Sequence, residues 1–157
     1  MEKLSIDEIE DLEEAMTAFM RVVKKPTYWE KFQDQAKVNI DRPAAAILQI
    51  LYRHECQFQS LVSQIGLEAP SISRKVHELE DKGLIERRPT TDKRIHELYL
   101  SQKAKKIVEQ LEEAKRSIMS EVLSSWTKEE KNQLITTLQR LSNSMKEYFE
   151  HKDQVKG

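Results

Sequence analysis

The 157-residue sequence has few residues that break helices and almost none that cross-link a chain. Only three glycines and four prolines occur, which excludes collagen-like and glycine-rich low-complexity structures and favours long helices. A single cysteine, Cys56, excludes an intramolecular disulfide framework. The longest apolar runs span four or five residues, far fewer than the roughly 20 that a membrane helix needs. We therefore expect one compact domain, extended by long helices, with no membrane partner.

The sequence also lacks the signatures of export and of common enzyme sites. Its N-terminus is acidic where a signal peptide would be basic and then apolar, so we expect a cytoplasmic location. It contains no glycine-rich phosphate loop, Gly-x-Ser-x-Gly turn or His-Glu-x-x-His helix, so we expect neither an enzyme nor a cofactor. His54 and Cys56 are close in sequence, but a closed zinc site needs about four ligands. His77 and His96 belong to a different, basic segment, so no metal site is predicted.

The net charge is −1, but the charges are distributed unevenly. Residues 1–20 contain seven acidic side chains and one basic one, whereas residues 69–106 contain ten Lys or Arg against six Asp or Glu. The even total therefore hides one basic module, as expected of a protein that binds nucleic acid. The alternative is that this uneven distribution of charge arose by chance on a solvated surface.

Long amphipathic helices are predicted near both ends of the chain. Apolar residues recur at steps of three and four over about residues 5–24, 102–124 and 128–152, so each helix has one apolar stripe. Three pairs have the capping-box spacing of a helix start: Ser5 and Glu8, Thr27 and Glu30, Thr127 and Glu130. The predicted stripes of the last two helices are Ile107, Leu111, Ala114, Ile118 and Val122, then Leu134, Leu138, Leu141, Met145 and Tyr148.

These stripes are longer than a small central module can cover, so we expect them to pair across a homodimer. The alternative is that the three helices pack against one another within one chain.

Between the long helices, the sequence predicts two short helices joined by a turn and followed by a β-hairpin. A helix starting at Asp41-Arg42-Pro43 precedes them. The first short helix spans 58–65 and ends at Gly66; the second begins at Pro70, buries an apolar stripe and ends at Gly83. Residues 84–88 and 94–100 are strand-like on either side of a turn. This order is typical of a winged helix-turn-helix.

The second short helix and the hairpin tip contain the residues expected to contact DNA. In a helix-turn-helix, the N-terminal residues of the second helix meet base edges in the major groove. Arg74 can bind guanine bidentately or clamp a phosphate. An arginine at the hairpin tip suits a narrow minor groove, and Asp92 can orient Arg94. The predicted DNA-binding residues are Pro70, Ser71, Ser73, Arg74, His77, Arg88, Asp92, Lys93 and Arg94.

The ordered motifs of this region resemble the multiple-antibiotic-resistance regulator (MarR) family. They are Leu61-Val62-x-x-Ile65-Gly66-Leu67, Ser71-Ile72-Ser73-Arg74, Leu79-Glu80-x-x-Gly83-Leu84-Ile85 and Asp92-Lys93-Arg94. Two departures are Val62, where the family usually has Ala, and Leu100-Ser101 without the usual following Gly. The resemblance implies a homodimeric winged-helix regulator that binds pseudo-palindromic double-stranded DNA and is often released by a small molecule.

The expected fold is mainly α: a winged helix-turn-helix with a small β-hairpin wing and long N- and C-terminal dimerisation helices. Residues 43–100 would bind DNA, and residues 1–42 and 101–157 would form the dimerisation region of a single integrated domain. The expected function is that of a dimeric, sequence-specific transcriptional regulator, a repressor released by an effector. The alternatives are a winged-helix module for protein–protein contact without specific DNA binding, and a ligand-insensitive regulator.

Candidate effector residues lie between the first long helix and the DNA module, where the resemblance places a pocket. A small apolar or aromatic-acid effector would suit aromatics with a few polar groups. The candidates are Trp29, Phe32, Ile40, Arg42 and Tyr52. The alternative is that Trp29 and Phe32 only pack the dimerisation helices onto the core. Cys56 is expected to be packed and unreactive at the end of a helix, the alternative being an oxidant-sensing thiol.

Overall fold

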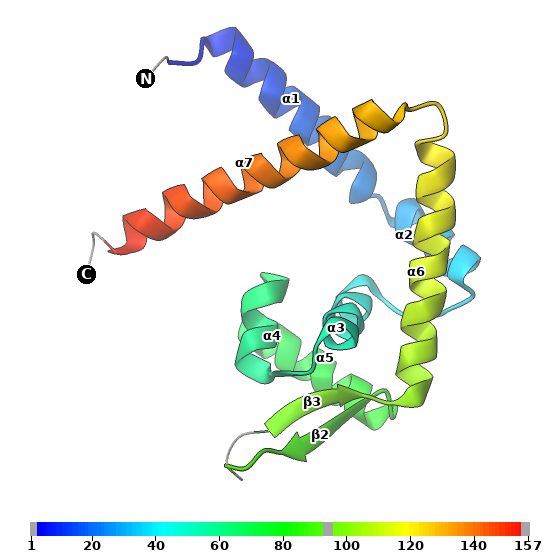
Figure 1. The fold of residues 1–157 in the computed structure, drawn as a ribbon. Helices are drawn as coiled ribbons and strands as arrows, with labels where there is room; N and C mark the ends of the chain where they lie inside the picture. Colours follow the sequence, from blue (N-terminus) through cyan, green and yellow to red (C-terminus); the bar gives the residue numbers. More distant parts are fainter. Residues whose placement is uncertain (1–2, 93–95, 155–157) are drawn as a thin grey trace. The chain divides into compact units, whose positions relative to one another are not determined.

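The computed structural model describes residues 3–92 and 96–154, with side chains described as far as residue 150 in the last helix (Figure 1). In the described residues the elements are α1 (Ile6–Val23), α2 (Pro26–Ala36), α3 (Arg42–Arg53), β1 (Cys56–Gln57), α4 (Phe58–Ile65), α5 (Ala69–Asp81), β2 (Ile85–Pro89), β3 (His96–Leu100), α6 (Gln102–Val122) and α7 (Lys128–Gln154). The chain falls into two compact units, residues 1–116 and 117–157, and α6 runs from the first into the second. The mainly helical fold with a small antiparallel sheet confirms the predicted fold class.

The helices α1 and α2 begin in different ways. Ser5 caps α1: the Glu8 amide donates to Ser5 Oγ over 3.2 Å, and the Ser5 amide donates to Glu8 Oε2 over 2.8 Å. The first predicted capping box is therefore confirmed. The predicted box at Thr27 and Glu30 is wrong, because α2 already begins at Pro26 and its start has no side-chain cap. Proline suits a first turn, since its missing N–H would be unpaired there in any case.

The core of the first unit lies between α3, α4, α5, α6 and the sheet. Asp41 caps α3 by accepting the Ala44 amide at Oδ1 over 2.9 Å, which confirms the start predicted there. The helices α4 and α5 have the predicted bounds to within a residue or two. The largest fully buried side chains are Ile47, Leu48, Leu61, Ile72, Val76, Leu79, Leu98, Val108 and Leu111. No polar or charged residue is buried among the described residues, so this core is held by apolar packing.

The sheet contains the predicted hairpin and one further strand. The strands β2 and β3 pair antiparallel, with Ile85 opposite Leu100. Residues 93–95, which the sequence placed at the end of the turn and the start of the second strand, lie outside the described residues. The strand β1 was not predicted, because two residues are too few for an alternating pattern. Its Cys56 pairs with Leu98 of β3, so this cysteine lies in a strand and not at a helix end.

The buried face of α6 differs from the predicted stripe. The residues buried on α6 are Ala104, Val108, Leu111 and Ala114. The prediction holds at Leu111 and Ala114 only, whereas Ile107 is half-buried and Val122 is exposed. Small side chains such as Ala104 let a helix pack closely against its neighbour. The predicted stripe consisted mostly of larger apolar residues and therefore did not include Ala104.

The helix α7 begins at the third predicted capping box. The Thr127 amide donates to Glu130 Oε2 over 2.7 Å, and the Glu130 amide donates to Thr127 Oγ1 over 3.1 Å. The box is therefore confirmed. It satisfies two of the four amides that a helix start leaves unpaired.

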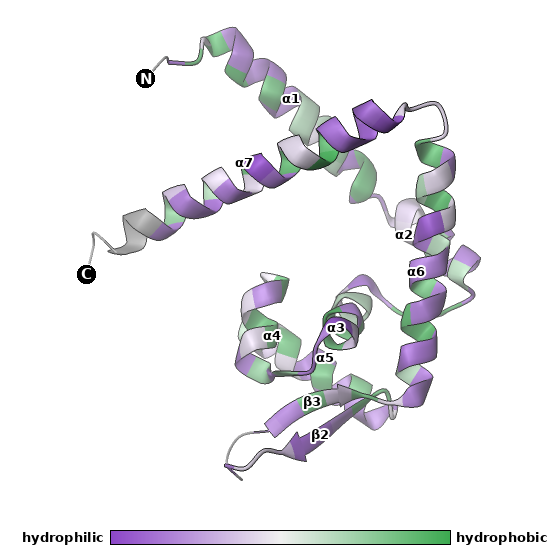
Figure 2. Ribbon diagram, in the orientation of Figure 1, coloured by the Kyte–Doolittle hydropathy of each residue, from purple (hydrophilic) through white to green (hydrophobic). Residues whose placement is uncertain are grey.

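Both α1 and α7 carry large apolar side chains that face solvent, and hydrophobic residues recur along both helices in Figure 2. On α1 no residue is buried. The exposed apolar residues are Ile6, Ile9, Leu12, Met16, Phe19, Met20 and Val22 on α1, and Leu134, Ile135, Leu138, Met145, Tyr148 and Phe149 on α7. Across the described residues, no helix combines the length and the apolar character needed to cross a membrane.

Candidate nucleic-acid interface

The helices α4 and α5 form the helix-turn-helix. Gly66 ends α4 in the left-handed conformation, with φ of 70°, which glycine adopts without the steric penalty of a side chain. Three residues later α5 begins, with Pro70 in its first turn. The apolar stripe of α5 is almost completely buried, with exposed fractions of 1% at Ile72, 0% at Val76 and 1% at Leu79. This burial holds the opposite face of α5 toward solvent.

The predicted contact residues of α5 lie on its solvent side. Pro70, Ser71, Arg74 and His77 are exposed, and Ser73 is half-buried. Arg74 has no ion-pair partner among the described residues. An exposed guanidinium of this kind has its full set of donors available for a phosphate or a base edge.

Glu80 connects α5 with β2. Its Oε1 accepts Arg87 Nε over 2.8 Å and its Oε2 accepts Arg87 Nη2 over 3.2 Å, which is a bidentate pair. His77 Nδ1 also lies 3.2 Å from Glu80 Oε2. Hydrogen bonds from Arg87 lower the pKa of the Glu80 carboxyl, and the same contact raises the pKa of Arg87. The sequence places Glu80 in the Leu79-Glu80 motif but does not pair it with a strand.

On the wing, Arg88 is held by its neighbours. Its Nη2 donates to Glu86 Oε2 over 2.8 Å, and its guanidinium lies 4.6 Å from the centre of the Tyr99 ring. The Tyr99 hydroxyl donates to Glu97 Oε2 over 2.7 Å, and hydrogen bonding to Glu97 raises the pKa of Tyr99. Two carboxylates, those of Glu86 and Glu97, therefore lie close to Arg88 on this face of the sheet.

The tip of the wing is only partly described. Asp92 is exposed, and its backbone carbonyl accepts Thr90 Oγ1 over 2.9 Å. Lys93 and Arg94, which the sequence predicts to contact DNA, lie outside the described residues. Their roles stay predictions.

A chain of ion pairs joins α5 to the start of α3. Lys75 Nζ lies 2.6 Å from Asp41 Oδ2 and 2.6 Å from Glu78 Oε2, and Lys82 Nζ lies 2.6 Å from Glu78 Oε1. Hydrogen bonds from both lysines lower the pKa of Glu78 from 4.5 to about 2. The spacing along α5 could have indicated the pairs at Glu78. Nothing in the sequence pairs Asp41 with Lys75.

Four of the five candidate effector residues come together. Trp29 Nε1 donates to the Ile40 carbonyl over 2.9 Å, and the rings of Trp29 and Phe32 stack with centres 5.5 Å apart. The Arg42 guanidinium lies 5.8 Å from the centre of the Trp29 ring. Tyr52 lies elsewhere, with its hydroxyl 3.5 Å from Glu109 Oε1 on α6. The polar groups of Trp29 and Arg42 thus already have partners within the chain, since Arg42 also donates to a backbone carbonyl of residue 25.

A cavity of about 440 Å³ lies beside this cluster. Its lining includes Ile40 and Asp41, with Glu78 from α5, Lys82 directly after α5 and Ile107 from α6. Of the five candidate residues, only Ile40 contributes to it. That these five residues bind an effector stays a prediction.

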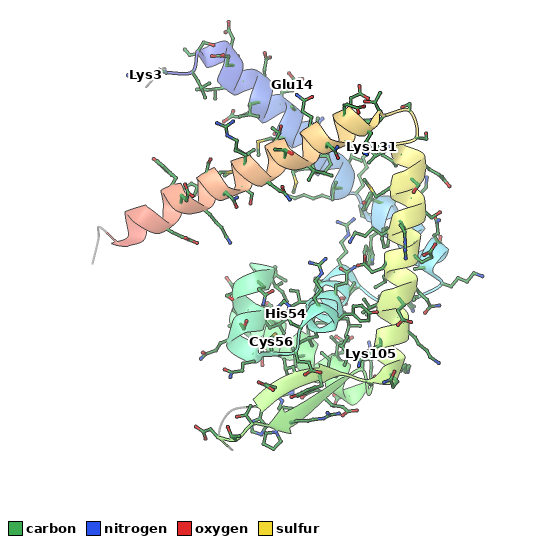
Figure 3. All side chains as sticks on the ribbon, viewed as in Figure 1. Lys3, Glu14, His54, Cys56, Lys105 and Lys131 are labelled. Atoms are coloured by element: carbon green, nitrogen blue, oxygen red, sulfur yellow. The ribbon has the colours of Figure 1, made fainter. Side chains whose placement is uncertain are left out.

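Cys56 of strand β1 is buried, and Figure 3 labels it next to His54, between α3 and α4. Burial and the nearby Glu97 carboxylate raise the pKa of the thiol. A raised pKa keeps the sulfur in its less nucleophilic thiol form. Among the described residues no three potential ligands cluster as a metal site would require.

A two-helix unit whose second helix presents an exposed polar face, followed by an antiparallel wing, defines a winged helix-turn-helix protein. Residues 40–96 match the model of the MarR family. This is the family that the motifs of the same segment resemble.

Several solved structures share the fold over most of the chain. A MarR family protein from Bacillus stearothermophilus is 20% identical, with a TM-score of 0.78 over 92% of this chain and 99% of that one. A MarR/EmrR family transcriptional regulator from Acinetobacter sp. ADP1 is 24% identical, with a TM-score of 0.69 over 92% and 99%. The organohalide sensing RdhR-CbdbA1625 transcriptional regulator in its 2,4-dichlorophenol bound form is 26% identical, with a TM-score of 0.67 over 92% and 87%.

Proposed function

We propose that this protein is a dimeric, sequence-specific DNA-binding transcriptional regulator. The observation that carries the proposal is the exposed polar face of α5, which holds Ser71, Arg74 and His77 opposite a fully buried apolar stripe. A helix mounted in this way can enter a major groove with its side chains directed at base edges. Residues 43–100 are proposed to bind DNA, and residues 1–42 and 101–157 to form the dimerisation region.

The experiment is a comparison of binding to two duplexes at physiological salt. One duplex carries the DNA upstream of the protein's own coding region, and the other is a random sequence of equal length. We expect the first to bind at least about 1,000-fold more tightly. Equal affinity would favour the alternative of a winged-helix module for protein–protein contact.

A dimer is supported by the apolar residues that α1 and α7 expose. Two copies related by a two-fold axis would place their α5 helices about one DNA turn apart, on the order of 34 Å, which matches a pseudo-palindromic operator. Footprinting on the upstream DNA is expected to show two half-sites with this spacing. Following the family resemblance, we propose that binding represses transcription. Transcription in vitro from the upstream DNA should then fall when the protein is added, and a rise would indicate an activator.

We further propose that a small apolar or aromatic-acid effector releases the DNA. Support comes from the cluster of Trp29, Phe32, Ile40 and Arg42, and from the relative whose structure holds 2,4-dichlorophenol. Aromatic acids and phenols titrated into a preformed complex are expected to dissociate it. Trp29→Leu should weaken this response, while Tyr52→Phe, which changes a residue outside the cluster, serves as the matched control. An unchanged complex would favour a ligand-insensitive regulator.

A further inference from the structure

The backbone between α2 and α3 is held by side chains of α2. The Ile40 carbonyl accepts Trp29 Nε1 over 2.9 Å and Gln33 Nε2 over 2.7 Å. A carbonyl oxygen has two lone pairs, so both have a donor here. This carbonyl belongs to the peptide group that joins Ile40 to Asp41. The two hydrogen bonds therefore fix the backbone directly before Asp41.

Asp41 in turn contacts two further helices through different oxygens. Its Oδ1 accepts the Ala44 amide over 2.9 Å and so caps α3, whereas its Oδ2 accepts Lys75 Nζ of α5 over 2.6 Å. Lys75 Nζ also donates to Glu78 Oε2 over 2.6 Å. A continuous series of hydrogen bonds thus leads from two side chains of α2, through Asp41, to α5.

A cavity lies where this series of bonds reaches α5. The cavity of about 440 Å³ is lined by Glu78 and Leu79 of α5, by residues 37–41 and by Ala44. Empty space on one side of a helix removes packing contacts that would otherwise resist its movement. Apolar packing is also non-directional, whereas the Asp41–Lys75 pair is a directional contact across this region. The pair therefore opposes a shift of α5 relative to the start of α3.

We propose that Asp41 is a positioning residue that couples α2 to α5, the helix proposed to read DNA. This inference rests on the proposed function and adds a route by which a change at the aromatic cluster of α2 reaches the DNA-binding face. Loss of the hydrogen bonds to the Ile40 carbonyl frees the backbone before Asp41, so its contact with Lys75 weakens. Helix α5 then spends a smaller fraction of the time in the position that suits a major groove.

The first test measures the affinity of the full-length protein for the upstream duplex relative to the random duplex. Asp41→Asn keeps an oxygen that can cap α3 but removes the charge that pairs with Lys75. We expect the ratio of the two affinities to fall by about five-fold, the upper end for an exposed ion pair. The loss of one negative charge by itself favours binding to both duplexes, so it does not produce this fall. Asp81→Asn, at the end of α5, is the matched control and should leave the ratio unchanged.

A double-mutant cycle tests the coupling to α2. Trp29→Phe together with Gln33→Leu removes both donors to the Ile40 carbonyl and keeps an aromatic ring beside Phe32. We expect this α2 variant to lower the affinity ratio, and we expect no further fall when Asp41→Asn is also present. Trp29→Phe alone, which keeps the Gln33 donor, should give a smaller fall of the same kind.

Amide hydrogen exchange of the free proteins provides a measurement that needs no DNA. Amides in the last two turns of α5 should exchange about five-fold faster in Asp41→Asn and in the α2 variant than in the wild type or in Asp81→Asn. Amides of α3 should keep their protection in Asp41→Asn, because the cap remains. Thermal unfolding of each variant confirms that the fold is intact.

The outcomes separate this inference from the proposed function. Equal affinity of the wild type for both duplexes would overturn the proposed function, and hydrogen exchange would then decide whether Asp41 positions α5. An Asp41→Asn variant with the wild-type affinity ratio would overturn this inference and leave the proposed function standing. Losses that simply add in the double-mutant cycle would overturn the coupling to α2.

Discussion

The charged residues of α5 differ in how far the fold has already engaged them. Arg74 faces solvent without an ion-pair partner among the described residues, whereas Lys75 and Lys82, which directly follows α5, form ion pairs with carboxylates. Arg87 and Arg88 of the wing are similarly neutralised by Glu80 and Glu86. A count of basic residues in the sequence therefore overstates the positive charge that this surface can offer to a ligand.

Arg74→Ala tests the surface of α5 directly. We expect the variant to bind the upstream DNA more weakly by about 1–3 kcal/mol, because a charge-assisted contact is lost. A relaxed base preference would assign Arg74 to a base edge. A slope of log K against log salt concentration that is smaller in magnitude by about one would assign it to a phosphate. Arg140→Ala on α7 removes the same charge elsewhere and is the control. Unchanged affinity in Arg74→Ala would exclude this face of α5 as the DNA surface.

Glu78 gives the folding stability a defined pH dependence. Its pKa falls from 4.5 to about 2 in the folded chain, so its ion pairs stabilise the fold above pH 4.5, and this stabilisation is lost as the pH falls toward 2. We expect Glu78→Gln to flatten the fall in the free energy of unfolding between pH 4.5 and pH 2, measured by urea denaturation. Glu10→Gln on α1 is the control, and its free energy of unfolding should decrease with falling pH as in the wild type. A Glu78→Gln curve parallel to the wild-type curve would contradict the role of these pairs.

Among the elements, α4 and α2 are compared because each has a left-handed C-cap, with a different residue type in that position. Gly66 ends α4 at φ of 70°, and Lys37 ends α2 at φ of 55°. Glycine adopts this conformation freely, while a residue with a Cβ adopts it at a cost. The α4 ending is therefore relaxed and the α2 ending is strained.

Exchanging the residue types at these two ends should change stability in opposite directions. Gly66→Ala should destabilise the fold by about 1–2 kcal/mol, and the loss is conformational because no atom beyond the adjoining residues lies within 4 Å of the added Cβ. Lys37→Gly should stabilise it by roughly 0.5–1 kcal/mol, since relief of strain exceeds the entropy cost of glycine. Urea denaturation measures both, with Lys37→Ala as a control that keeps the Cβ. Equal stability of Gly66→Ala and the wild type would contradict this account.

The molecule as a whole leaves large apolar stripes exposed on α1 and α7. Soluble monomers rarely expose long contiguous apolar surfaces, because each buried square ångström of such surface is worth about 25 cal/mol. A second copy of the chain is the partner proposed to cover them.

Light scattering at micromolar concentration tests this assembly. We expect the wild type to have twice the 18.5 kDa mass of one chain. Phe19→Glu on α1 and Leu138→Glu on α7 should each shift the protein toward the monomer, because a charge would be buried in the interface. Gln139→Glu adds the same charge one residue further along α7 and should leave the mass unchanged. A wild-type mass of 18.5 kDa would contradict the dimer.

Much of the fold followed from local patterns in the sequence. The start of α3, the bounds of α4 and α5, two capping boxes and the hairpin were predictable, because helix periodicity, caps and turns depend on residues within a few positions of one another. The buried stripe of α5 was predictable for the same reason, and it placed Ser71, Arg74 and His77 on the opposite face. The same logic failed at Thr27 and Glu30, where Pro26 offered a competing helix start only one residue away.

The sequence by itself therefore determined the order of the elements, the face of α5 that points outward and the family motifs. Only the tertiary structure decided the third strand, the buried face of α6 and the pairs between elements. Asp41 and Lys75 are 34 residues apart, and Trp29 and Ile40 are 11 apart. Arg87 reaches Glu80 only because the chain turns back at Gly83. Such contacts depend on how the elements pack in space, and local propensity carries no information about that packing.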